Sequence, residues 1–198
     1  MCIRDSAKDN RHLTLLYDEV KFYRGNSLEP PLIKLPDWES LPYDVFSPDQ
    51  KITSERLRTL ASLPTLNHGL LLITLEAVIQ RLPPPTHILG QTFFLAVGDR
   101  LNLESFRKRL QCAGYRSVSQ VMEQGEYAIR GGVIDIFPLG NIRPFRLDLF
   151  GPEIESIRLF DSETQRSLES VTKIDILPAR EISLTDKSIS IFRANYRT

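Results

Sequence analysis

The sequence predicts a mixed α/β and α+β protein: a parallel α/β unit over residues 8–90 and an α+β unit with an antiparallel sheet over residues 91–178. In the first ninety residues, segments with helical apolar periodicity alternate with short apolar runs, which is typical of a parallel sheet with helices. The Leu-Pro-Pro-Pro segment at residues 82–85 then breaks this alternation. Beyond it, short alternating segments separated by glycine pairs are typical of antiparallel hairpins.

The first unit is expected to begin after a leader of residues 1–7, because MCIRDS joins no periodic pattern and resembles cloning sequence. From Asn10 onward, apolar residues recur at three- and four-residue steps, and this spacing predicts an amphipathic helix that ends at Gly25 and Asn26. The residues on its apolar face are Leu13, Leu16, Val20 and Tyr23.

The rest of the first unit is predicted as strand, helix, strand and helix. An apolar run over Pro31–Leu35 indicates a strand, and Ser54 is the expected N-cap of a helix that carries Leu57, Leu60 and Leu63. Gly69–Thr74 is continuously apolar, as in a strand that is covered on both faces. A helix over Glu76–Leu82 should follow it.

The second unit should open with a strand over Phe93–Val97 and a helix capped by Asn102 and ended by Gly114. Short strands are then expected between Tyr127 and Asp161, with a bulge at Gly131-Gly132. Residues 179–198 should begin a further unit with a helix that carries Ile189, Phe192 and Tyr196 on one face.

Composition and motifs favour a binding module over an enzyme. Lysine plus arginine and aspartate plus glutamate number 25 each, so the chain has no general attraction for a polyanion. The sequence contains no Gly-Lys pair for a phosphate loop, no metal-ligand spacing among three histidines and two cysteines, and no nucleophile motif. We expect no cofactor, no metal and no small-molecule substrate. No segment is predicted to enter a membrane, and cysteine usage suits the cytoplasm.

The segment PFRLDLF at residues 144–150 has the two-residue period of a half-buried strand. Phe150 falls on the polar side with Arg146 and Asp148. An exposed aromatic ring beside an arginine and an acid is typical of an interface hot spot. A twist of the strand that lets Phe150 cover the edge of the core explains the pattern equally well.

Arg130, just before Gly131-Gly132, is predicted to face solvent, opposite in direction to Tyr127 and Ile129. If its strand pairs with that of Arg146, the two guanidinium groups share a surface that suits carboxylates of a partner. The alternative is two unrelated surface arginines, because a bulge would change the register. For Asp135, Asp148 and Asp161, surface pairing is a simpler explanation than acid–base catalysis.

The segments GEYAIRGGVIDIFPLG and RPFRLDLFGPEIESIRLFD resemble the second domain of the transcription-repair coupling factor (Mfd) family and its counterpart in UvrB. The resemblance implies that residues 91–178 bind UvrA through Arg130, Arg146 and Phe150, with Asp148 between two of them. It also implies that residues 8–90 are a partial UvrB domain 1a-like unit of P-loop-NTPase type that lacks its first strand and P-loop position. Residues 179–198 would begin domain 1b.

The implied function is recruitment of UvrA in transcription-coupled nucleotide excision repair. In this family, whole proteins are ATP- and Mg-dependent translocases on double-stranded DNA that displace stalled RNA polymerase. The alternatives are a fragment of a UvrB-like excinuclease subunit and a DNA-binding or motor fragment. The short connection from Trp38 to Ser54 leaves no room for the DNA-clamping hairpin of UvrB, and balanced charge argues against a DNA-binding fragment.

Overall fold

The computed structural model describes residues 6–25, 29–40, 49–182 and 186–196 and divides the chain into two compact units. The first unit ends at Leu89 and the second begins at Gly90, beside the boundary expected near residue 90. The protein combines helices with parallel and antiparallel sheets, so the mixed fold class is confirmed in this general form.

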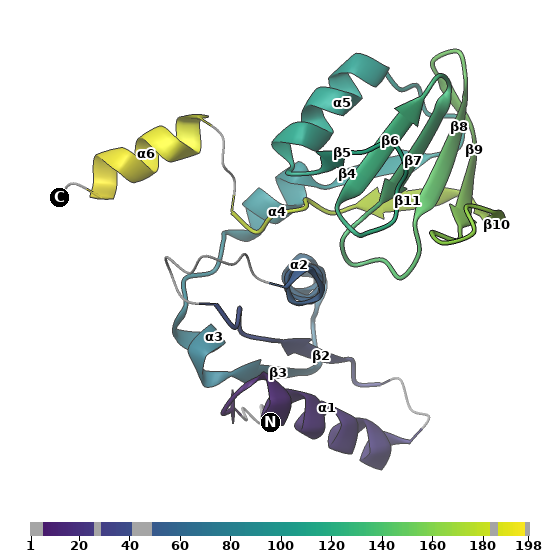
Figure 1. Cartoon of the computed structure of the whole chain (residues 1–198). Helices are drawn as coiled ribbons and strands as arrows, with labels where there is room; N and C mark the ends of the chain where they lie inside the picture. Colours follow the sequence, from purple (N-terminus) through teal and green to yellow (C-terminus); the bar gives the residue numbers. More distant parts are fainter. Residues whose placement is uncertain (1–5, 26–28, 41–48, 183–185, 197–198) are drawn as a thin grey trace. The chain divides into compact units, whose positions relative to one another are not determined.

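The first unit is built on a three-stranded parallel sheet in the order β1-β3-β2, formed by Ser6–Ala7, Leu70–Thr74 and Leu32–Leu35. Figure 1 shows α1 (Asn10–Arg24) and α2 (Gln50–Ser62) on opposite faces of this sheet. Leu13 of α1 packs with Ala7 and Leu72 in a buried cluster. The alternation of helix and strand that the sequence predicts is therefore present.

Ser6 and Ala7, the last two residues of the expected leader, pair with β3, whereas residues 1–5 lie outside the described residues, so the leader stays a prediction. Two other expectations for the first unit were wrong in detail. The helix α2 begins four residues before Ser54, because the Asp49 carboxylate accepts the N–H of Lys51 and caps it. The helix predicted over residues 76–82 is the shorter α3 (Leu75–Ile79).

The Leu-Pro-Pro-Pro segment at residues 82–85 does not form a long loop after α3. A short helix, α4 (Pro85–Gln91), begins at the last proline of the run. Proline is tolerated in the first turn of a helix, because the N–H that it lacks would have no partner there. The segment beyond the predicted second unit contains α6 (Asp186–Tyr196), the expected helix, in which Ile191 is exposed.

The second unit contains a six-stranded sheet in the order β10-β9-β8-β7-β6-β5, which is antiparallel except for the β5–β6 pair. Its strands are Arg116–Ser117, Glu126–Arg130, Val133–Phe137, Phe145–Phe150, Glu153–Phe160 and Ser167–Val171. The strands β4 (Phe93–Ala96) and β11 (Lys173–Ile176) form a separate antiparallel pair. The predicted meander of short strands is confirmed.

One face of the six-stranded sheet carries the main core. The helix α5 (Leu103–Cys112) lies against this face (Figure 1). Its Phe106 and Leu110 belong to one buried cluster with residues of β4 and β11. Asn102 caps α5 by accepting the N–H of Ser105, as the sequence predicted. The side chains that β6–β9 contribute to this core include Tyr127, Ile134, Ile136, Leu147 and Ile157.

The turn between β6 and β7 sets the register of the site. Gly131 has a φ of 59°, which glycine adopts without strain, and the ladder remains regular up to the Arg130–Val133 pair. The bulge expected at Gly131-Gly132 is therefore absent from this hairpin. The irregularity lies instead in the pairing of β8 with β9, between Asp148 and Leu149.

Candidate functional site

The second face of the sheet carries a row of charged side chains. Across neighbouring strands, Asp135 of β7 lies opposite Arg146 of β8, and Arg146 lies opposite Arg158 of β9. Residues on one strand alternate between the two faces, so Arg146 and Asp148 point away from the core that Leu147 enters. The sheet thus places arginines and acids from three strands on one surface.

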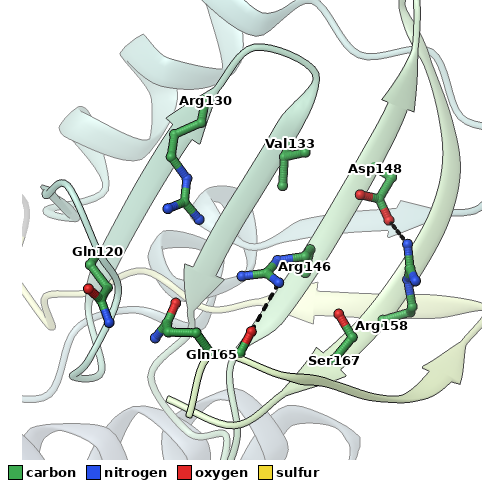
Figure 2. Close-up of a pocket in the computed structure, with 8 residues that line it drawn as sticks. All are labelled: Gln120, Arg130, Val133, Arg146, Asp148, Arg158, Gln165 and Ser167. Carbon is green, nitrogen blue, oxygen red and sulfur yellow. Dashed lines mark hydrogen bonds and ion pairs between the residues drawn. The ribbon is translucent and has the colours of Figure 1, made fainter. Parts of the chain in front are cut away.

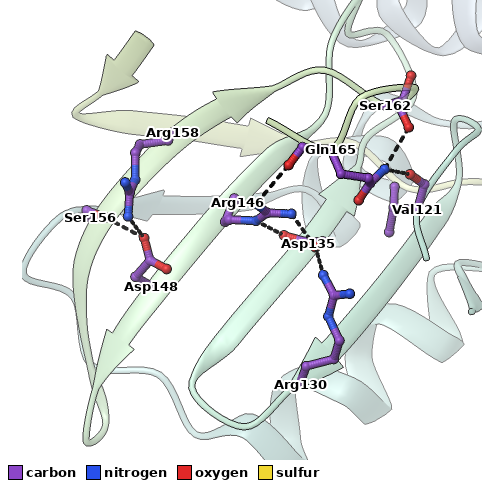
Figure 3. A network of polar contacts seen from close by, with 9 residues as sticks. All are labelled: Val121, Arg130, Asp135, Arg146, Asp148, Ser156, Arg158, Ser162 and Gln165. Atoms are coloured by element: carbon purple, nitrogen blue, oxygen red, sulfur yellow. Dashed lines mark hydrogen bonds and ion pairs between the residues drawn. The ribbon is translucent and has the colours of Figure 1, made fainter. Parts of the chain in front are cut away.

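Asp135 joins the two predicted arginines (Figure 3). Its carboxylate is fully buried and accepts hydrogen bonds from Arg146 Nε at 2.6 Å and Arg146 Nη2 at 2.9 Å. Arg130 Nη2 donates to the same carboxylate. The hydrogen bonds with Asp135 raise the pKa of Arg146. The buried carboxylate of Asp135 therefore fixes the direction of both guanidinium groups.

The Arg146 side chain is held on its other sides as well. Its Nη1 donates to the carbonyl of Gln165 at 3.2 Å, and its guanidinium carbon lies 4.7 Å from the centroid of the Phe160 ring. Gln165 adopts a left-handed backbone conformation, with a φ of 60°, in the turn between β9 and β10. Its side-chain amide donates to the carbonyls of Val121 and Ser162. This turn holds Arg146 in a single orientation.

A second acid–base group lies beside the first (Figure 3). The carboxylate of Asp148 accepts hydrogen bonds from Arg158 Nη2 and, at 2.8 Å, from the Ser156 hydroxyl. Burial would raise the pKa of Asp148, but the bonds from Arg158 and Ser156 outweigh it and lower that pKa. Asp148 is therefore a carboxylate at neutral pH and is occupied by its own neighbours.

Residues of both groups line a shallow depression of about 580 Å³ (Figure 2). The charged residues of its lining are three arginines and one acid: Arg130, Arg146, Arg158 and Asp148. Gln120, Val133, Gln165 and Ser167 complete it. Because Asp135 lies buried beneath, the lining presents more positive than negative groups to solvent.

Phe150 lies at the end of β8, paired with Glu153, and 79% of it is exposed. Leu149 packs against the core, so alternation along the strand places Phe150 on the same side as Arg146 and Asp148. The ring is too exposed to cover the core, so the alternative of an edge-capping aromatic does not hold. The structure thus brings an apolar ring and several guanidinium groups to one face.

A third network fixes the loop that borders this face. Glu126 of β6 accepts the N–H groups of Met122 and Glu123 and a bond from Arg116 Nη2 at 2.6 Å. Burial alone would raise the pKa of Glu126, but these hydrogen bonds lower it. The loop that leads into β6 is therefore tied to the sheet at its base.

The sequence-predicted residues Arg130, Arg146, Asp148 and Phe150 share one face, as the register shows. Sequence reasoning missed Arg158 and Gln165 and treated Asp135 as a surface residue. Alternation along β9 was the available signal for Arg158, since its neighbour Ile157 is a core position. No helix among the described residues is long and apolar enough to cross a membrane, and no metal-binding cluster of acidic, histidine and cysteine side chains occurs among them.

Comparison with known proteins agrees with the sequence motifs. Residues 93–182 match the family model of the UvrB interaction domain. The chain is 48% identical over 162 residues to the transcription-repair-coupling factor of Haemophilus influenzae, covering 82% of the chain and 14% of that protein. It is 42% identical over 191 residues to that of Escherichia coli, covering 96% and 16%. For Myxococcus xanthus the identity is 33% over 186 residues, covering 92% and 16%.

The chain therefore spans about one sixth of the length of these relatives. The resemblance that the sequence motifs indicated is confirmed over most of the chain.

Proposed function

Because residues 93–182 match the family model of the UvrB interaction domain, we propose that the chain is a member of this family and a docking module that recruits the repair protein UvrA. The contact surface is the second face of the six-stranded sheet. Its arginines offer forked donors to carboxylates of UvrA, and the exposed ring of Phe150 enters an apolar pocket. The residues that carry the contact are Arg130, Arg146 and Phe150, with Asp148 between them.

The observation that supports this proposal most strongly is the convergence of Arg130 and Arg146 on one buried carboxylate beside an exposed aromatic ring. Side chains held in one orientation lose little entropy when a partner binds. A buried aspartate that serves only folding would not require a neighbouring exposed phenylalanine. Interface hot spots typically combine arginine and aromatic side chains in this manner.

Binding of purified UvrA to the complete 198-residue chain tests the proposal, with isothermal titration calorimetry as the measurement. Phe150→Ala should weaken binding by about 2 kcal/mol or more, since truncation of a central anchor costs this much. Phe94→Ala is the matched control, because Phe94 is 71% exposed on β4, outside the six-stranded sheet. Equal affinity of the wild type and the Phe150 variant would reject the proposed face.

The arginines are tested in the same titration. Arg130→Ala and Arg146→Ala should both weaken binding of UvrA, whereas Arg107→Ala on the exposed side of α5 should leave it unchanged. Circular dichroism of each variant separates lost contact from lost folding. Absence of any binding by the folded wild-type chain would overturn the function itself.

We further propose how the chain relates to its longer relatives. Residues 8–90 would be a partial UvrB domain 1a-like unit of P-loop-NTPase type, and residues 179–198 the start of domain 1b. The whole proteins would be cytoplasmic, ATP-dependent DNA translocases that displace stalled RNA polymerase and pass the lesion to UvrA. In this scheme the chain contributes recruitment, without ATP or Mg of its own. ATP hydrolysis above background by the purified chain would contradict this division.

A further inference from the structure

The three arginines of the depression differ in how many of their donors are already used. Arg146 donates through Nε and Nη2 to Asp135 and through Nη1 to Gln165, and only 17% of its side chain is exposed. Among the described residues, Arg158 donates through Nη2 alone, to Asp148. A guanidinium group carries five N–H donors. Arg158 therefore retains most of its hydrogen-bonding capacity.

Two further observations place Arg158 at the same surface. It lies directly opposite Arg146 across β8 and β9 and lines the same depression as Arg130 (Figure 2). Its side chain is 40% exposed, and its Nε is buried without an acceptor among the described residues. An incoming group does not reach the buried Nε, so the donors available to a partner are those of the exposed part of the guanidinium group.

The charges around Arg158 make an acidic group the fitting ligand. Arg146 and Arg158 are neighbours across two strands, where like charges repel each other. Asp148 offsets part of this repulsion, but it also accepts from Ser156 and is the only acid in the lining of the depression. An incoming carboxylate would relieve the remaining repulsion and accept the unused donors.

We propose that Arg158 is a further contact residue, which binds a carboxylate side chain of the partner at the depression that Arg130 also lines. This inference rests on the proposed recruitment of UvrA. Arg146, with three of its five donors already used, then acts mainly through its charge and as a support for the surface. Asp148 is a positioning residue, because it holds the Arg158 guanidinium over the depression.

The test is titration of UvrA into the complete chain that carries Arg158→Ala. A charge-assisted hydrogen bond contributes roughly 1.5–3 kcal/mol, so the dissociation constant should rise at least about ten-fold. Arg158→Lys keeps the charge but loses the forked donors, so it should fall between the alanine variant and the wild type. Arg107→Ala on α5 is the control and should bind like the wild type.

Asp148→Asn separates contact from support. If Arg158 served only to hold Asp148, then Asp148→Asn would weaken binding at least as much as Arg158→Ala does. A direct contact predicts a smaller loss for Asp148→Asn than for Arg158→Ala, because the guanidinium group is still present. A loss for Asp148→Asn that equals or exceeds that for Arg158→Ala, or equal binding by Arg158→Ala and the wild type, would overturn the inference while leaving recruitment intact. A folded wild-type chain that does not bind UvrA would overturn both.

Discussion

Replacement of Asp135 by asparagine removes the negative charge on which both arginines converge, with little change in volume. Asp135 is fully buried, and three nitrogens of Arg130 and Arg146 donate to it. In the variant, the amide oxygen retains one acceptor, but its NH₂ group faces guanidinium donors. The prediction is a less stable second unit in which the two arginines no longer have fixed directions.

The expected loss of stability follows from the burial of the three groups. Removing one partner of a buried ion pair costs about 3–5 kcal/mol. Arg146 keeps 17% exposure and Arg130 keeps 52%, so water can reach both guanidinium groups after the change. We therefore expect a loss near the lower limit, about 3 kcal/mol. Arg130→Ala should cost less, about 1 kcal/mol, because this pair is half exposed.

Urea unfolding followed by far-UV circular dichroism measures this loss as a lower midpoint. The only tryptophan, Trp38, lies in the first unit, so its fluorescence serves as an internal control on that unit. The variant should also bind UvrA more weakly when binding is measured without urea, at a temperature where the variant is fully folded. An Asp135→Asn chain with an unchanged midpoint would refute the view that the buried carboxylate organises this face.

Three further predictions concern the supports of the site. Hydrogen bonds lower the pKa of Glu126 in spite of its burial. The stability that Glu126 contributes is therefore present above the unfolded pKa of about 4.3 and is lost as pH falls through the folded pKa. The urea midpoint of Glu126→Gln should accordingly fall less than that of the wild type as the solution is acidified. Tyr115→Phe leaves the buried Leu177 carbonyl without its 2.6 Å bond and should cost about 1–2 kcal/mol in chemical unfolding. Gly131→Ala should cost about 1 kcal/mol in thermal unfolding through its left-handed backbone alone, since a Cβ there meets open space. Equal midpoints for wild type and variant would contradict the latter two.

Strand alternation predicted much of the site. It placed Arg146, Asp148 and Phe150 on one side of their strand, and the structure agrees. It did not show whether Arg130 lies near Arg146, because that depends on the register of three strands. The regular two-residue turn at Gly131-Gly132 fixes this register, and a bulge there would have reversed the result.

The burial of a side chain was harder to predict than the face of the sheet to which it points. Asp135 alternates as a polar-face residue, which suggested a solvated acid, yet the arginines and the turns around them remove it from solvent. These turns come from segments distant in sequence, so local patterns carry no signal for them. The wrong helix cap at Ser54 has a local cause, because Asp49, five residues earlier, is also a capping residue and occupies that position.

The turn between β9 and β10 has a consequence for transplanting this surface onto another scaffold. Gln165 reaches Arg146 through its carbonyl and Val121 through its amide, so two outer loops determine the position of a strand residue. A graft of the β6–β8 strands alone would carry Arg130 and Arg146 without the loop contacts that orient Arg146. Any miniature version, or any inhibitor scaffold that copies this surface, must also include residues 118–124 and 161–166 at their present lengths.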